Sequence, residues 1–439
     1  MSATNRIAMT DADAQLLSQS HRERVYRRNF PFFLADSLLF TLAMAIISAT
    51  TVIPDFLRHL TGSEILIGLS GSLFTIGFTL PQLFIARYIV RSARKKWWFV
   101  GPNILVRPAM LICAMLTAWL GRDHPTLVLL VFFTCYSIAA FGDGLVGVPW
   151  ADLAGTSLDN RWRARVFGLT SAVTGVIMLG LTPLIGTVLG PTGPGFPANY
   201  AVLFGAAGLL FIVSILPGLF FHELPGGSAR EQLPAFGEFL PDLLRLLRAD
   251  GSFRAFIVVR VFNSLFMMAA PFYIGYATGQ LGLSSDVAVP VLLAMQTIGS
   301  VAGALVYTWL GARSNLLYIW LALGGSALLP ICALLAEVAG PWPLYFGFLL
   351  SGLATTNLQF GFLNWVVGYA DADQRPIYVG LSNTVSAVIS LIAPFIAGTI
   401  VQSAGYRPLF VAALAMALIA LFVALRSLRD PEQPAPARP

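Results

Sequence analysis

Long apolar segments alternate with short polar ones along nearly the whole chain. Each apolar segment has about 19 to 25 residues, which matches the roughly 20 residues that a helix needs to cross a ~30 Å hydrocarbon core. The fifth and sixth segments share one uncharged stretch, and the run GPTGPGFPANY divides it because repeated Gly and Pro cannot continue a helix. The pattern predicts twelve spans, near residues 30–53, 65–86, 97–120, 126–149, 166–189, 200–221, 253–277, 287–310, 316–337, 343–367, 377–401 and 408–426.

Composition supports the same interpretation. Of the 439 residues, 57% are hydrophobic and only 11% are charged, whereas about a quarter of the residues of a soluble domain are charged. No soluble domain is visible that could carry a basic face, so the net charge of +6 does not indicate nucleic-acid binding. The four histidines lie outside the span interiors and no ATP-binding loop is present. We therefore expect no metal, no cofactor and no enzymatic activity.

The distribution of basic residues predicts orientation. If both termini lie in the cytoplasm, 22 of the 27 Lys and Arg residues fall on that side and only three on the other, as the positive-inside rule requires. The densest basic run, ARYIVRSARKKWW at residues 86–98, becomes the cytoplasmic loop between the second and third spans. Contact with lipid phosphates is one role that such a loop can have. We expect an integral protein of the bacterial plasma membrane, with protein–lipid contacts at this face.

The chain also repeats itself. Arg163 lies five residues before Gly168-Leu169, and Arg375 lies five residues before Gly380-Leu381. Gly186 and Gly398 have the same separation of 212 residues, and a tryptophan ends spans four and ten. An internal repeat of six spans is typical of secondary transporters. The predicted units are a tail (1–29), a first bundle (30–221), a central loop with a short amphipathic helix (222–252), a second bundle (253–426) and a tail (427–439).

At this point the sequence resembles the major facilitator superfamily, whose most recognisable motif, GxLaDrxGRKxxl, lies between helices two and three. Ala93-Arg94-Lys95 falls on its Gly-Arg-Lys, while Ala86 and Val90 replace its first Gly and its Asp. The resemblance implies an all-α fold of twelve helices in two pseudo-symmetric six-helix bundles. It also implies a charged cytoplasmic gate, with Asp152 and Asp159 as candidate partners of the basic loop. The gate residues that we expect are Arg91, Arg94, Lys95, Lys96, Asp152 and Arg163.

Four charged residues fall inside predicted spans: Asp36, Arg107, Asp143 and Arg260. A charge within a membrane is costly and by default indicates function. In the family that the chain resembles, helices one, four, seven and ten line the cavity, so three of these charges are expected there and Arg107 is expected to be structural. The alternative is a fixed ion pair of Arg107 with Asp36 or Asp143. The expected substrate- or proton-binding residues are Asp36, Asp143, Arg260, Asn263, Asn357, Gln359 and Asn364.

These observations predict a secondary transporter that moves a small molecule by alternating access, with Asp36 or Asp143 carrying a coupling proton. A partial match of GVIMLGLTPLIGTVLG (residues 175–190) to the antiporter motif of the family favours antiport. Aromatic neighbours of the expected cavity favour export of amphipathic compounds: Phe262, Phe266, Phe272, Tyr273 and Trp365. Import of a sugar or polar metabolite, and a sensor that does not transport, remain alternatives.

Overall fold

The computed structural model describes residues 11–89, 94–223, 248, 250–311, 313–356, 358–370 and 375–429. Over these residues the chain is helical, and short turns join the helices. The first half contains α1 (Asp11–Ile46), α2 (Val52–Arg58), α3 (Glu64–Ile89), α4 (Lys96–Val106), α5 (Ala109–Leu120), α6 (Pro125–Ser157), α7 (Asn160–Leu189), α8 (Ala198–Val213) and α9 (Ile215–Leu219). The second half contains α11 (Gly251–Phe266), η1 (Met267–Ala269), α12 (Phe272–Gly279), α13 (Ser285–Val306), η2 (Tyr307–Gly311), α14 (Asn315–Ala339), α15 (Trp342–Thr355), α16 (Leu358–Tyr369), α17 (Arg375–Ala404) and α18 (Tyr406–Ser427).

Eleven helical segments of the described chain are long and apolar enough to cross a membrane. The remaining expected span is α3, which has 26 residues and is apolar over Glu64–Thr79. The all-α polytopic fold expected from the sequence is therefore confirmed. The Gly- and Pro-rich run does divide α7 from α8. The expected amphipathic helix of the central loop lies almost entirely outside the described residues.

The first span differs from the sequence expectation at both ends. Its helix, α1, already begins at Asp11, within the segment expected to be a polar tail, and it ends at Ile46 instead of near residue 53. At the break, Thr51 Oγ1 donates a hydrogen bond to Ser48 Oγ (2.8 Å), and Ser48 Oγ lies 3.2 Å from Thr50 Oγ1. The separate helix α2 begins directly after this cluster of hydroxyl groups.

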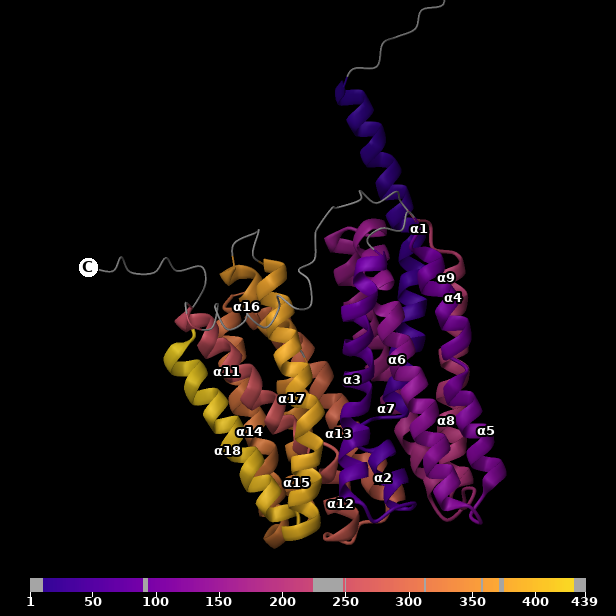
Figure 1. Ribbon diagram of the computed structural model, residues 1–439, viewed down its shortest axis with the longest axis vertical. Helices are drawn as coiled ribbons and strands as arrows, with labels where there is room; N and C mark the ends of the chain where they lie inside the picture. The colour runs from indigo at the N-terminus through magenta and orange to yellow at the C-terminus, as the bar shows by residue number, and fades with distance from the viewer. Residues whose placement is uncertain are drawn as a thin grey trace, which may run out of the picture.

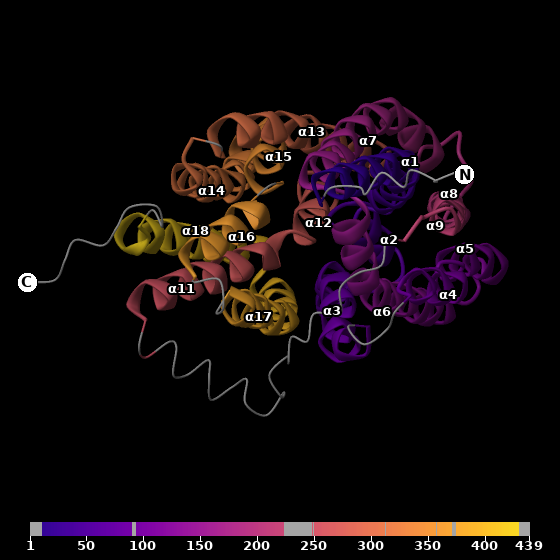
Figure 2. The same cartoon turned by 90° about the horizontal axis from the view of Figure 1, so that it is seen from above.

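The two halves use the same helix pairings. In the first half α3 packs on α6 and α5 on α8, and in the second half α13 packs on α15 and α14 on α18. Seen from above, the helices of each half form a separate group, side by side (Figure 2). The most extensive contacts between the groups are those of α3 with α17 and of α7 with α13, and α2 adds smaller contacts with α12 and α13. In the two most extensive contacts, α3 of the first half corresponds to α13 of the second, and α7 corresponds to α17. The two pairs are therefore equivalent, as an internal repeat predicts.

We call the end where the bundle carries Arg94, Lys95 and Arg161 the basic end, and the end that carries α2 and α12 the far end (Figure 1). At the far end, two glycines lie so close to the opposite half that a side chain at either position would require the neighbouring atoms to move. A Cβ on Gly398 of α17 would lie 2.5 Å from Ile65 Cα, and one on Gly68 of α3 would lie 3.0 Å from the carbonyl oxygen of Pro394. The far end is therefore closed by backbone contact.

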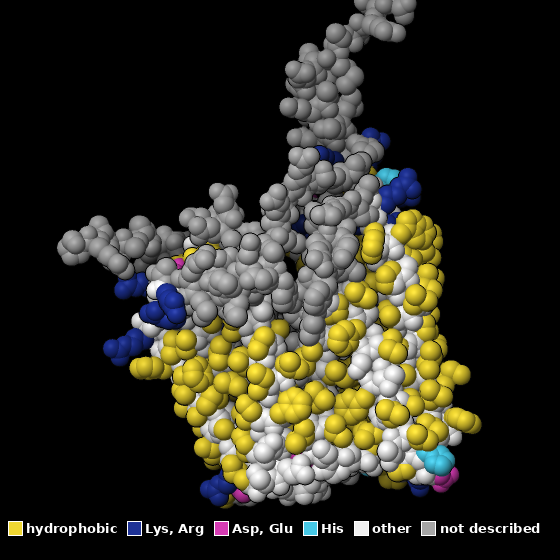
Figure 3. Space-filling view, viewed as in Figure 1, with side chains coloured by type: hydrophobic (Ala, Val, Ile, Leu, Met, Phe, Trp, Pro, Cys, Tyr) yellow, Lys and Arg dark blue, Asp and Glu magenta, His cyan; other side chains and the backbone are white. Residues whose placement is uncertain are grey.

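The outer surface carries the lipid-facing side chains of an integral membrane protein. Leu105, Trp119 and Val338 are 80%, 80% and 92% exposed, which water would penalise. Hydrophobic side chains cover the middle of the face seen in Figure 3, while Lys and Arg side chains lie toward its edges. A hydrocarbon solvent around the middle of the bundle explains this arrangement.

Candidate binding cavity between the two halves

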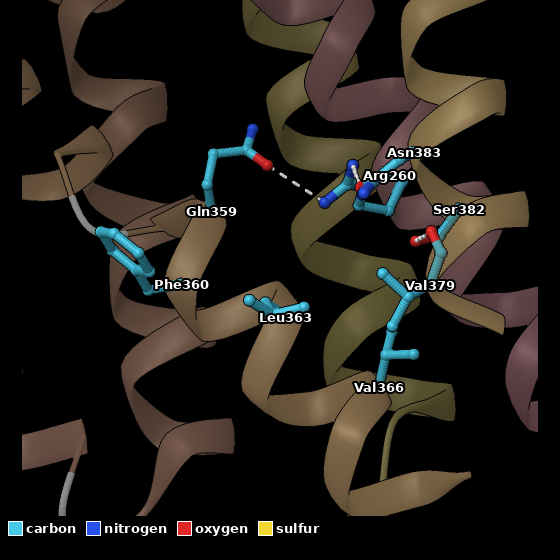
Figure 4. A pocket seen from close by; sticks show the side chains of 8 residues that line it. All are labelled: Arg260, Gln359, Phe360, Leu363, Val366, Val379, Ser382 and Asn383. Carbon is cyan, nitrogen blue, oxygen red and sulfur yellow. Dashed lines mark hydrogen bonds between the residues drawn. The ribbon is translucent and has the colours of Figure 1, made fainter. Parts of the chain in front are cut away.

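Arg260 of α11 is held by three neutral acceptors. Its Nε donates to Ser386 Oγ (2.9 Å), Nη1 to Gln359 Oε1 (3.1 Å) and Nη2 to Asn383 Oδ1 (3.2 Å). Gln359 comes from α16, and the other two residues come from α17 (Figure 4). The guanidinium also lies over the ring of Phe362, 5.2 Å from its centroid. Arg260 is only 6% exposed, so this cation is fixed in place and largely removed from solvent.

Two cavities meet at Arg260. The smaller has a volume of about 200 Å³ and lies between α11, α16 and α17 (Figure 4). The larger has a volume of about 520 Å³ and lies between the halves, lined by α3, α11, η1 and α17. Asn263, one helical turn from Arg260, lines the larger cavity, and its buried Oδ1 has no hydrogen-bond partner among the described residues. The cavity therefore combines a fixed cation with an unsatisfied acceptor.

A third cavity of about 820 Å³ lies between α1, α7, α13, η2 and α16. Asn364 lines it and donates to the hydroxyl of Tyr307 (2.7 Å). Thr50 donates to Gln296 Oε1 (3.3 Å) beside it, which joins the end of α1 to α13 across the halves. No charged side chain lines this cavity among the described residues. Its polar lining consists of Thr41, Ser48, Ser171, Thr174, Gln296, Thr297, Ser300, Tyr307, Thr308, Thr356 and Asn364.

The expected cavity acids lie elsewhere, inside the first half. Arg107 Nη1 lies 3.7 Å from Asp36 Oδ1, and Asp36 Oδ2 accepts a hydrogen bond from Trp150 Nε1 (2.8 Å). Arg107 also interacts electrostatically with Asp143, and it donates to Asn103 Oδ1 (2.9 Å). Together these side chains form a buried cluster with two carboxyl groups and one guanidinium, so it has a net charge of −1 when all three are ionised.

The structure does not bring these acids to Arg260. Neither Asp36 nor Asp143 lines any of the three cavities, and no carboxylate of the described chain lies within 4.0 Å of Arg260. The expectation of acids facing a base across a central cavity is therefore not met. Asn357 of the expected site lies outside the described residues.

Two partners of Arg260 were not expected from the sequence. Asn383 and Ser386 lie on α17, where polar side chains follow one another at residues 382, 383, 386 and 390. A spacing of three or four residues places them on one face of a helix. This polar stripe in an otherwise apolar span is the pattern that could have identified them.

At the basic end, the charged loop bonds within the first half. The ammonium of Lys95 forms an ion pair with Asp152, one of its two expected partners. The other candidate, Asp159, instead caps α7 by accepting from the amide of Trp162 (2.8 Å). Glu223 accepts from the backbone amide of Lys95 (2.7 Å).

The remaining expected gate residues are Arg91, Arg94, Lys96 and Arg163. Lys96 donates from its backbone amide to Glu223 (3.3 Å), and Arg163 donates to the carbonyl oxygen of Gly155 (3.2 Å). Arg94 is exposed beside them, and Arg91 lies outside the described residues. These bonds join parts of the first half to one another or to Glu223, at the start of the central loop.

The far end contains an ion pair that the sequence analysis did not single out. Arg58 donates to both carboxylate oxygens of Glu64 (2.8 and 2.7 Å) and lies over the ring of Tyr406 in the second half, 5.5 Å from its centroid. A side chain at Gly275 would collide with the guanidinium of Arg58. Arg58 therefore belongs to the contact that closes the far end.

A buried carboxyl lies next to this contact, in α2. Asp55 accepts from the hydroxyl of Tyr200 (2.6 Å) and interacts with Ser285 of α13 in the second half. Asp55 lies outside the spans and is 1% exposed. Burial raises the pKa of Asp55, and its hydrogen bonds oppose that rise only in part. Asp55 therefore couples a protonatable group to the packing of the two halves.

Part of the chain is similar in sequence to a known family. The family model of the Major Facilitator Superfamily matches residues 257–439. No curated protein sequence matches the chain. The expected resemblance to this superfamily is thus found in the sequence of the second half, which is less than half of the chain.

Several solved structures share that fold. A nucleoside transporter, NupG, crystallised as a point mutant, has a TM-score of 0.68 at 12% identity, covering 91% of this chain and 100% of its own. A D-xylose-proton symporter has a TM-score of 0.66 at 13% identity, covering 93% and 99%. An auto-inhibited peptide transporter of the POT family has a TM-score of 0.65 at 14% identity, covering 93% and 99%. At these identities the likeness shows the fold alone.

Proposed function

Because the chain has the fold of the major facilitator superfamily, we propose that it is a secondary transporter that moves a small polar molecule by alternating access. The observation that carries this proposal is the pair of cavities between the halves, about 520 and 820 Å³ in volume, in which hydroxyl and amide side chains lie among apolar ones. Small-molecule sites have volumes of roughly 300 to 1,000 Å³ with a few convergent polar groups. Arg260 and Asn263 supply such groups in the first cavity, and Asn364 supplies one in the second.

The aromatic residues that suggested an amphipathic substrate lie away from the cavities, although Phe78, Phe167 and Phe360 line them beside the hydroxyl and amide groups. Phe266, Phe272, Tyr273 and Trp365 are buried in packed clusters, and neither they nor Phe262 line any of the three cavities. The structures with a similar fold include a nucleoside transporter, a D-xylose-proton symporter and a peptide transporter. Uptake of a polar metabolite is therefore the direction that we favour, and export is the alternative.

Closure of the far end supports an arrangement in which the cavities face the basic end. Gly68 and Gly398 bring α3 and α17 into backbone contact there, and Arg58 bridges toward Tyr406. The excess of basic residues assigns the basic end to the cytoplasm. We infer that the structure is the state whose cavities face the cytoplasm, with both termini in the cytoplasm of a bacterial cell.

The buried cluster of Asp36, Arg107 and Asp143 suits proton coupling. Two carboxyl groups share one guanidinium, so one bound proton would make the cluster neutral. A buried charge without a partner is costly, and release of that proton would bias the packing of α1 against α4 and α6. In this proposal Asp36 or Asp143 carries the proton, and Arg107 holds the two acids in place.

Transport in proteoliposomes tests the function. Purified protein would be reconstituted and the uptake of labelled polar solutes measured, with Thr75→Trp as the blocking variant, because Thr75 lines the 520 Å³ cavity. Thr399→Trp is the matched control, since Thr399 is an exposed threonine of α17. Uptake that Thr75→Trp abolishes and Thr399→Trp preserves is the expected result. Binding of a solute without uptake would favour the alternative of a sensor that does not transport.

A further inference from the structure

Arg260 is a buried cation whose three hydrogen-bond partners are all neutral. Its three hydrogen bonds go to a hydroxyl and two amide oxygens, and no carboxylate within the described residues lies within ion-pair distance. An arginine remains protonated in proteins, so its charge cannot be removed by releasing a proton. A buried charge without a counter-charge is unfavourable, and it is more so within a membrane.

The guanidinium still has donors to offer. Of its five N–H groups, three are used by Ser386, Gln359 and Asn383, which leaves one on each Nη. Two parallel N–H groups match the two oxygens of a carboxylate. Because Arg260 lines both the 200 Å³ and the 520 Å³ cavities, a ligand that fills the space between the halves can reach it.

A second observation points to a ligand in the same place. Asn263 is 5% exposed and lines the 520 Å³ cavity, and its Oδ1 has no partner in the described chain. Buried polar groups are rarely left unpaired. A rotation of the Asn263 amide would turn this oxygen toward the cavity, where it fits a ligand hydroxyl next to an anionic group. Thr50, Ser72 and Ser390 add further hydroxyls to the wall.

We propose that the central cavity binds a small hydroxylated monocarboxylate, with the carboxylate on Arg260 and a hydroxyl on Asn263. This inference rests on the proposed transport function and names its substrate class. Arg260 is the single charged residue that lines the three cavities among the described residues. One positive charge balances one carboxylate, whereas it would leave half the charge of a phosphate monoester dianion uncompensated.

Thermal melting of the purified protein in detergent tests binding without reference to transport. The probes form matched sets: gluconate with glucose and glucose 6-phosphate, and lactate with lactamide. At least one monocarboxylate is expected to raise the melting temperature when its neutral partner does not. Arg260→Gln is expected to weaken that binding roughly 10- to 100-fold, as for a lost hydrogen bond to a charged group. Arg426→Gln, at an exposed position of α18, is the control and should bind as the wild type does.

Two further readouts keep the test decisive if Arg260→Gln binds nothing. Without ligand, this variant should melt at or above the wild-type temperature, because an uncompensated buried charge has been removed; a purely structural arginine would instead lose stability. Asn263→Ala should weaken the binding of gluconate more than the binding of hexanoate, because hexanoate lacks the hydroxyls. Three results would overturn the proposal. They are that no monocarboxylate binds, that the rise in melting temperature caused by a monocarboxylate persists in Arg260→Gln, or that glucose 6-phosphate binds more tightly than gluconate.

Transport measurements separate this inference from the function on which it rests. Binding of a monocarboxylate that depends on Arg260, without uptake in proteoliposomes, would retain the anion site and refute transport. Uptake of a neutral solute that Arg260→Gln leaves unchanged would retain transport and refute the anion site.

Discussion

Arg107 Nη1 lies 3.7 Å from Asp36 Oδ1, and both side chains are buried within the first half of the molecule. The pair joins the loop between α4 and α5 to the middle of α1, and Trp150 of α6 completes it by donating to the other oxygen of Asp36. Three membrane helices are thus tied together by one charged contact. Asp36 and Asp143, which were expected to face Arg260, lie beside Arg107 instead.

Arg107→Gln is expected to be strongly destabilising. Removing one partner of a buried ion pair leaves an uncompensated charge and costs about 3 to 5 kcal/mol. Thermal unfolding of the purified protein in detergent measures the loss, with Arg426→Gln as the control for removing an arginine at an exposed site. If Arg107→Gln unfolds at the wild-type temperature, Arg107 does not hold the cluster together.

Asp36→Asn and Asp143→Asn distinguish the proton carrier from its neighbour. In proteoliposomes that contain a pH dye, substrate should drive proton movement in the wild type. The variant that lacks the carrier should lose this movement while it still binds substrate, because the 520 Å³ cavity contains neither acid. Equal proton movement in both variants and the wild type would exclude the cluster from coupling.

Asp55→Asn is expected to gain stability relative to the wild type as pH rises. Burial raises the pKa of Asp55, so the folded protein holds this proton more tightly than the unfolded chain, in which the pKa is about 3.9. The contribution of Asp55 to stability is therefore present at low pH and is lost as pH rises through the folded pKa.

Melting temperatures between about pH 4.5 and 7 measure this effect of Asp55. The difference between Asp55→Asn and the wild type should grow with pH. A difference for Asp55→Asn that shrinks with pH would contradict the sign.

Gly398→Leu is expected to prevent closure of the far end. A Cβ at this position would lie 2.5 Å from Ile65 Cα, so α17 and α3 must separate. A cysteine introduced at Ser72, which lines the 520 Å³ cavity, should then react several-fold faster with an impermeant maleimide added outside intact cells. The native cysteines are buried and should contribute little background.

Gly180→Leu is the matched control for Gly398→Leu. Nothing lies within 4 Å of a Cβ at Gly180 on α7, so labelling of the Ser72→Cys protein should remain at the wild-type rate. Unchanged labelling in Gly398→Leu would show that the glycine contact does not close the far end.

Much of the architecture could be predicted because the bilayer imposes it. Each span needs about 20 apolar residues, so the lengths of the apolar segments predicted the helices and the Gly- and Pro-rich run predicted the break before α8. The same argument marked Asp36, Arg107, Asp143 and Arg260 as unusual, since each is a charge within a span. All four are buried in the structure.

The break after Ile46 was not predicted, for a different reason. Ser48, Thr50 and Thr51 bond to one another or to Gln296 of α13, and the last of these contacts exists only once the second half has packed against the first. Asn383 and Ser386 were missed because their value as ligands depends on where the guanidinium of Arg260 lies.

The sequence by itself determined that the chain consists of apolar spans, where most of these spans lie, and which four charges the membrane must accommodate. The tertiary structure decided which charges meet: Asp36 and Asp143 lie with Arg107, and Arg260 faces a cavity with neutral partners. The physical reason is that a membrane helix is apolar both toward lipid and toward its neighbours. Its sequence pattern therefore specifies that it spans, but the rotation that turns a charge toward one neighbour or another is set by packing alone.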